Sequence, residues 1–211
     1  MRRPLTYVSI TALIVGLAFV LTINDFLAIN RRVEANILVV EGWAYNRPAI
    51  REAAEEFERG QYRILVTVGG PNDGVEGNPD QTSSAVLAAN RLQELGIDKR
   101  HIVALTVPGV SRHRTYASAL ALRNWLRDSG TQPAGVNVFT IGPHARKSLV
   151  LFSRALGPGI AVGVIAGTDD DYDPDRWWVS ARGIYVISRK LLGYLYAVTW
   201  PFPENLSLNA T

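Results

Sequence analysis

The sequence predicts an α/β fold: a Rossmann-like parallel sheet of about five strands with helices on both faces, preceded by one transmembrane helix. Short apolar runs alternate with amphipathic stretches along most of the 211-residue chain, and Gly or Pro separates many of them. An uncharged and longer apolar run, Leu5 to Ile23, precedes the first of these short apolar runs. We therefore expect an N-terminal membrane anchor over residues 1–32 and a single α/β domain over residues 33–211.

The N-terminal run predicts a membrane anchor that is not cleaved. Leu5 to Ile23 has about the length needed to cross a hydrocarbon core of about 30 Å, and no A-x-A-like cleavage site follows it. Arg2 and Arg3 favour a cytoplasmic N-terminus, although the pair at 31–32 nearly balances them. We expect a single-pass protein of the inner or plasma membrane, with its soluble domain outside the cytoplasm and the lipid bilayer as its partner.

Strands and helices are expected to alternate along the domain. Apolar runs predict strands at 36–40, 63–68, 101–107, 137–141 and 160–165. Amphipathic stretches predict helices at 48–60, 81–95 and 114–128, after Gly142-Pro143, and at 175–198. In the first helix we expect Glu52, Glu55, Glu56 and Glu58 to face water. This alternation predicts right-handed crossovers and a parallel sheet.

Composition excludes several classes of protein. The chain has no Cys, which excludes a disulfide scaffold, a thiolate zinc site and a cysteine nucleophile. Its net charge is only +3 and no long basic cluster appears, so no nucleic-acid partner is expected. The acidic segment 169–175 resembles a calcium loop, but Pro174 and Ser180 occupy its sixth and twelfth positions, where an EF-hand needs Gly and Glu. We predict a solvated loop and helix cap there, with no metal and no cofactor.

Two basic helix starts follow strands of the predicted sheet. His144, Arg146 and Lys147 begin one helix, and Arg114 begins another directly after His113. Cations are unfavourable at a helix N-terminus because the helix dipole is positive there. Their presence is explained if an anion binds between them. The alternative is that they are solvated surface residues.

Further candidates follow the other strands at the same edge of the sheet. His144 is a candidate acid/base or anion ligand, or else a capping or surface histidine. Glu41 is a candidate general base or ligand, or else a loop carboxylate paired with Arg47 or Arg51. Trp43 could stack on a sugar ring, although core packing is the better interpretation.

Glycines and hydroxyl side chains complete the candidate set. Gly69 and Gly70 allow close approach to a ligand, or form a plain tight turn; no P-loop pattern surrounds them. Ser111 and Thr115 offer hydroxyl groups, but no G-x-S-x-G elbow supports a serine nucleophile. The aromatic residues between 177 and 200 are expected to lie in the core or at a membrane interface.

The order of these motifs resembles a known family. An apolar strand ends in Glu41-Gly42, and then come Val68-Gly69-Gly70, Ser111-x-x-x-Thr115 and Gly142-Pro143-His144-Ala145-Arg146. This order is similar to that of the ElyC-SanA-YdcF family of bacterial envelope proteins, which share a YdcF-like domain. The resemblance implies an α/β protein, often with one or two membrane helices, that acts in envelope integrity and in peptidoglycan or lipid-carrier metabolism.

The resemblance also implies which residues line a pocket. They are Gly69, Gly70, Ser111, Thr115, His144 and Arg146. Many members have a Gly-rich turn after the first strand, where this chain has Glu41-Gly42-Trp43.

The sequence therefore predicts an envelope protein, either an enzyme or a precursor-handling protein, that binds an anionic precursor such as a lipid-linked glycan. His144 would act as acid/base, and Arg114, Arg146 and Lys147 would neutralise a phosphate or carboxylate. Two alternatives are a non-catalytic integrity or assembly factor and a cytoplasm-facing nucleotide-type binder. No protein partner is predicted.

Overall fold

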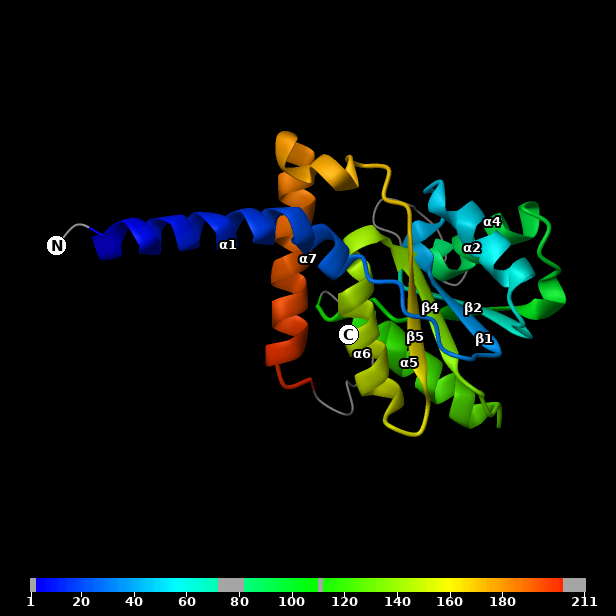
Figure 1. The fold of residues 1–211 in the computed structure, drawn as a ribbon. Coiled ribbons are helices and arrows are strands. Elements are labelled where there is room, and N and C mark those ends of the chain that lie inside the picture. The colour runs from blue at the N-terminus through cyan, green and yellow to red at the C-terminus, as the bar shows by residue number, and fades with distance from the viewer. Residues whose placement is uncertain (1–2, 72–81, 110–111, 203–211) are drawn as a thin grey trace.

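The protein folds around a five-stranded parallel sheet with the strand order β3-β2-β1-β4-β5 (Figure 1). The computed structural model describes residues 3–71, 82–109 and 112–202. Every neighbouring pair of strands is parallel. The strands are β1 (Ile37–Glu41), β2 (Ile64–Gly69), β3 (Ile102–Thr106), β4 (Val136–Ile141) and β5 (Val162–Gly167). The predicted Rossmann-like α/β fold is confirmed.

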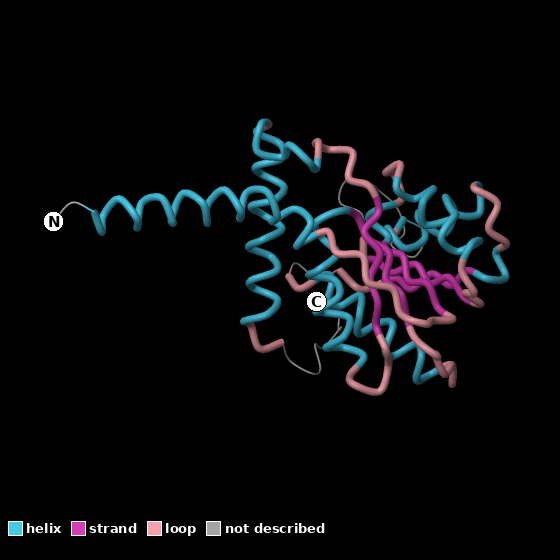
Figure 2. The backbone as a smooth tube through the Cα atoms, viewed as in Figure 1, coloured by secondary structure: helices cyan, strands magenta, loops and turns pink. Residues whose placement is uncertain are grey.

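Helices cover both faces of this sheet (Figure 2). Leu38 and Val40 of β1 face one core cluster, which also holds residues of α2 (Ala49–Arg59) and α4 (Ser84–Glu94). Ile37 and Val39 face the opposite cluster, beneath α5 (Arg114–Asp128) and α6 (Ala145–Leu156). A strand with both faces buried needs a continuous apolar sequence, which is why β1 is an unbroken apolar run.

Two predictions about helices were wrong in detail. The helix expected at 175–198 is two elements, the 3₁₀ segment Pro174–Val179 and α7 (Ala181–Thr199). Ser180 is extended between them, and its side chain accepts a hydrogen bond from the backbone N–H of Gly183, which starts α7 afresh. Glu56 is buried rather than facing water, because Arg32 donates two hydrogen bonds to its carboxylate, at 2.9 and 2.8 Å.

The N-terminal helix α1 (Arg3–Leu27) projects from the domain and crosses α7 near its own C-terminal end (Figure 1). Ile23 and Leu27 are buried there among side chains of α7 and the preceding 3₁₀ segment. The backbone of Arg31 then pairs with Val164 of β5. The predicted domain boundary between residues 32 and 33 therefore falls inside a packed region.

The predicted transmembrane helix is not found among the described residues. In that part of the chain, no helix combines the length and the apolar character needed to cross a membrane. The side chains that α1 presents beyond the domain include several exposed apolar ones, among them Leu13, Ile14 and Val15.

Candidate functional site

The candidate site lies where the strand order reverses. β1 is hydrogen-bonded to β2 on one side and to β4 on the other. The chain leaves β1 through the 3₁₀ turn Gly42–Ala44 and leaves β4 through the 3₁₀ turn Gly142–His144. The helices that follow, α2 and α6, pack on opposite faces of the sheet. Such a divergence leaves a crevice at the carboxyl ends of the strands, which is where open α/β sheets bind ligands.

His144 lies in this crevice and is buried, so it is not a surface histidine. Its Nε2 lies 3.4 Å from Oγ1 of Thr115, and its Nδ1 lies 3.1 Å from Nζ of Lys190. An ammonium group only donates hydrogen bonds, so Nδ1 accepts from Lys190 and the ring proton sits on Nε2. The ring also meets the edge of Trp43, with 5.4 Å between centroids.

Glu41 supplies a buried carboxylate beside this histidine. Its Oε2 lies 3.7 Å from Nε2 of His144 and accepts a 2.7 Å hydrogen bond from Oγ of Ser148. The alternative of a loop carboxylate paired with Arg47 or Arg51 is wrong, because Glu41 is the buried last residue of β1 and its carboxylate contacts Ser148 and His144. Arg47 pairs with the aspartates at 169–171 instead. Glu41 and His144 therefore form a contacting carboxylate–imidazole pair at the end of the sheet.

The positive charges around His144 are crowded. Burial, with the charges of Lys190, Lys147 and Arg189, lowers the pKa of His144 well below its usual value, so the imidazole is neutral at pH 7. Burial and the nearby Lys147 lower the pKa of Lys190 from 10.5 to about 8. Burial also lowers the pKa of Lys147, although Glu41 opposes that effect. We call Lys147, Arg189 and Lys190 the cationic cluster; an anion bound beside it would favour the charged form of the lysines, which burial and then mutual repulsion disfavour.

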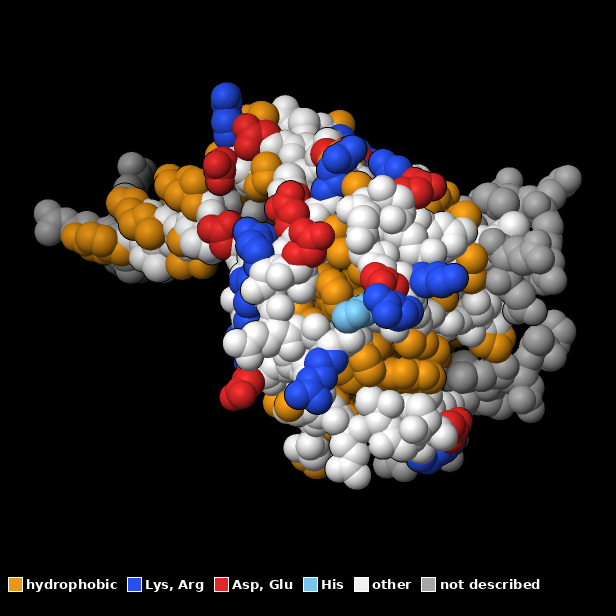
Figure 3. Space-filling model, turned by 90° about the vertical axis from the view of Figure 1, so that its right-hand side faces the viewer, with side chains coloured by type: hydrophobic (Ala, Val, Ile, Leu, Met, Phe, Trp, Pro, Cys, Tyr) orange, Lys and Arg blue, Asp and Glu red, His pale blue; other side chains and the backbone are white. Residues whose placement is uncertain are grey.

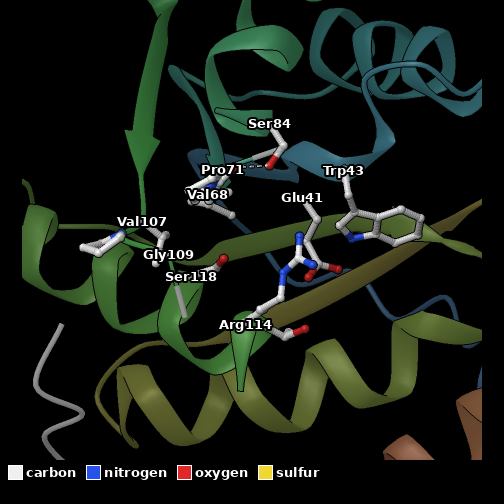
Figure 4. A pocket seen from close by; sticks show the side chains of 13 residues that line it. Glu41, Trp43, Val68, Pro71, Ser84, Val107, Gly109, Arg114 and Ser118 are labelled. Atoms are coloured by element: carbon white, nitrogen blue, oxygen red, sulfur yellow. Dashed lines mark hydrogen bonds between the residues drawn. The ribbon is translucent and has the colours of Figure 1, made fainter. Parts of the chain in front are cut away.

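Two adjoining hollows make one cleft at this edge of the sheet. The first has a volume of about 300 Å³, and Figure 4 shows Glu41, Trp43 and Arg114 turned into it. The second, about 340 Å³, contains His144, Lys190 and the rest of the cationic cluster. Both are lined by Trp43, Arg114 and Thr115, so the two hollows share a wall. One face of the molecule shows basic and acidic side chains gathered around a histidine and an apolar hollow (Figure 3).

The structure brings most of the predicted site residues to this cleft. Those that line it are Glu41, Trp43, Gly69, Gly70, Arg114, Thr115, His144 and Lys147. Ser111 lies outside the described residues. Trp43 fits both of its interpretations, because it borders the cleft and also packs against a core cluster.

Arg146 is not in the cleft, which corrects the prediction that it converges with His144 and Arg114. Its guanidinium stacks 3.8 Å from the ring centroid of Phe26, and its Nε donates to the backbone oxygen of that residue. The reason is helical geometry: neighbouring residues on a helix point about 100° apart, so Lys147 faces the cleft while Arg146 faces α1.

Gly69 also has a packing reason. A Cβ added there would lie 2.1 Å from Oγ of Ser84 at the start of α4. Its lack of a side chain lets α4 approach β2, so Gly69 has a packing role that needs no ligand.

Sequence reasoning missed the contribution of α7. Arg182, Arg189 and Lys190 line the second hollow together with Tyr185. Their spacing of seven and eight residues, in a helix otherwise rich in apolar and aromatic residues, was the signal that could have found them, because that spacing places side chains on one helix face.

The acidic segment beside the cleft is neutralised by arginines. Asp169, Asp170 and Asp171 lie close enough together to share a metal ion. Arg47 pairs with all three, and Arg182 pairs with Asp171. Burial raises the pKa of Asp169, and Arg47 opposes that shift.

Comparison with known proteins adds no relative to this description. No family model, curated protein or solved structure matches the chain. The resemblance to the ElyC-SanA-YdcF family therefore stays a prediction from the motifs, and the function is argued from the cleft itself.

Proposed function

We propose that this protein binds an anionic cell-envelope precursor, a phosphate- or carboxylate-bearing molecule such as a lipid-linked glycan, in the cleft at the strand switch point. The observation that carries the proposal is the cationic cluster, because Lys147, Arg189 and Lys190 line one hollow together with His144. Burial and then the neighbouring positive charges lower the pKa values of both lysines. Glu41 is the carboxylate that opposes these shifts most directly. Groups held in this way gain from a second anion more than solvated surface cations do.

Arg114 and Trp43 extend the binding surface away from the cluster. Arg114 lines both hollows from the first turn of α5, and Trp43 borders them from the turn after β1. Nζ of Lys190 lies 4.9 Å from the ring centroid of Trp43. This arrangement offers charge to an anionic group and an aromatic face to a sugar ring in the same ligand.

We also propose that α1 attaches the protein to the inner or plasma membrane, with the domain on the extracytoplasmic side. This proposal is supported by the uncharged run from Leu5 to Ile23 and by the exposure of Leu13, Ile14 and Val15 beyond the domain. Cell fractionation with an alkaline wash tests the attachment, and we expect the protein in the membrane pellet. A reporter fused after Thr211 that is active only in the cytoplasm would contradict the envelope location.

The anion site is tested by melting the full chain in a non-ionic detergent with increasing phosphate. We expect stabilisation that exceeds that of sodium chloride at equal ionic strength. Lys147→Ala should weaken phosphate binding by roughly 1.5–3 kcal/mol, the range for a hydrogen bond to a charged group. Arg146→Ala is the matched control, because it removes a cation from the same helical turn on the side away from the cleft; it should bind phosphate like wild type.

Two results would remove the proposal. One is a wild-type protein that gains nothing from phosphate beyond the chloride control. The other is an equal loss of phosphate binding in Lys147→Ala and Arg146→Ala, which would mean that the response depends on total charge rather than on a specific site.

A second candidate function is acid–base chemistry on the bound ligand, and the contact between His144 and Glu41 favours it. A neutral imidazole next to a carboxylate can take part in proton transfer with a bound substrate. Incubation with phosphomonoesters and diphosphates, with release of inorganic phosphate as the readout, tests this function. Activity that disappears in His144→Gln supports an enzyme; binding without turnover supports the non-catalytic alternative.

A further inference from the structure

A third hollow adjoins the cleft and differs from it in character. Its volume is about 230 Å³. Its apolar lining comes from α6, α7 and the segment after α7: Leu151, Gly193, Tyr196, Ala197 and Phe202. Arg114, Thr115 and Lys147 line this hollow as well as the second hollow of the cleft. Arg114, Thr115 and Lys147 therefore lie at the boundary between the apolar hollow and the cationic cleft.

We propose that this apolar hollow holds the hydrocarbon chain of an amphiphilic anion whose charged head lies in the cationic cleft. The inference rests on the proposed function, since the head group is the anion proposed there. It adds a subsite and narrows the ligand class to a phosphate or carboxylate carrying a hydrocarbon chain.

Lys147 is the residue that joins the two subsites. Its Cδ lies 3.5 Å from where a Cβ of Gly193 would be, so the aliphatic part of the side chain lies along α7 at the apolar hollow. The same side chain also lines the second hollow of the cleft, beside His144 and Lys190. A long cationic side chain placed in this way contacts hydrocarbon with its stem and an anion with its head.

The size and position of the hollow suit a chain. An apolar cavity of about 150 Å³ is enough to bind a benzene molecule, and this hollow is larger. Tyr196, which lines it, is 40% exposed, and Leu192 and Leu195 on the same helix are 67% and 46% exposed. Tyr196 thus borders both the hollow and the exposed apolar side of α7, the helix that α1 crosses (Figure 1). A chain leaving the hollow would pass along that side of α7, toward the proposed membrane surface.

The test is the affinity of the full chain for inorganic phosphate and for a series of n-alkyl phosphates from ethyl to octyl, measured by calorimetry in a non-ionic detergent. We expect affinity to rise about fourfold per methylene, which corresponds to about 0.8 kcal/mol for each CH₂ buried. Gly193→Leu adds a side chain inside the hollow and should flatten this dependence. Ser188→Leu adds the same side chain on the exposed face of α7 and should keep the wild-type slope.

Tyr196→Ser gives a second variant, at a side chain that is 40% exposed. It should reduce the gain in affinity per methylene, because the smaller side chain opens the hollow to water. If wild type binds inorganic phosphate without a chain-length dependence, or if both variants keep the full slope, the hydrocarbon subsite is wrong while the anion site stands. If wild type binds neither inorganic phosphate nor any alkyl phosphate, the anion site itself is wrong.

Discussion

Replacing Lys190 by Met should weaken phosphate binding and yet stabilise the protein. Replacing a lysine with a purely structural role would instead lower the stability. The pKa of Lys190 is lowered from 10.5 to about 8 by burial and by Lys147, so the folded protein holds this proton less readily than the unfolded chain does. A difference of that size corresponds to about 3 kcal/mol against folding when the ammonium is charged in both states. The hydrogen bond to Nδ1 of His144, 3.1 Å long, is lost in the variant. That loss offsets about 1–2 kcal/mol of the gain.

We therefore expect Lys190→Met to stabilise the ligand-free protein by about 1–2 kcal/mol near pH 7 and to weaken phosphate binding by about tenfold or more. The pH dependence identifies the cause. Below about pH 8 the full cost of the buried charge is present; between pH 8 and 10.5 only the unfolded chain holds the proton, so wild-type stability rises with pH. The advantage of the variant should shrink over that window.

Urea denaturation of both proteins at about pH 7 and about pH 10 measures this advantage. Lys99→Met is the matched control, since Lys99 is exposed, and its stability should stay within about 0.5 kcal/mol of wild type. A Lys190→Met protein that is less stable than wild type at pH 7, or whose advantage is unchanged at high pH, refutes the reasoning.

Three further predictions concern the scaffold. Glu56→Ala should destabilise the protein by about 1–3 kcal/mol. Because hydrogen bonding from Arg32 lowers the pKa of Glu56 below 4.5, the wild-type advantage should be lost as pH falls through that lowered value, as acid titration of both proteins by circular dichroism will show. Deletion of residues 1–19 should leave a folded domain, whereas deletion of residues 1–30 removes two buried apolar side chains and should cost about 3–6 kcal/mol in chemical denaturation; equal stability of the two would contradict the packing of α1. Gly142→Ala, at a φ of 45° and with its new Cβ 2.9 Å from a neighbouring side chain, should lower the free energy of unfolding by about 1–3 kcal/mol, and an unchanged melting temperature would count against that strain.

Much of the candidate site was predictable because it follows from strand direction. Glu41 and His144 each follow a buried apolar run, and parallel strands end at the same edge of the sheet. A sequence that alternates strands and helices therefore places both residues together before any contact is known. The bounds of α5, at Arg114 and Asp128, match the expected ones. The sequence could predict them because an apolar strand precedes the helix and the apolar residues of the helix repeat with helical spacing.

The sequence by itself determined the α/β alternation, the set of loops that form the site and most of the residues in them. The reason is that strands buried on both faces and amphipathic helices each have a characteristic pattern of apolar residues over a short stretch of sequence. Only the tertiary structure decided which side chains face the ligand. It turned Lys147 into the cleft and Arg146 onto Phe26, and it brought Lys190 of α7 to His144 across 46 positions of the chain. It also gave Glu56 a buried partner in Arg32, which precedes it by 24 residues. These outcomes depend on contacts between segments that are distant in sequence. The free energy of such contacts cannot be derived from a local pattern of residues.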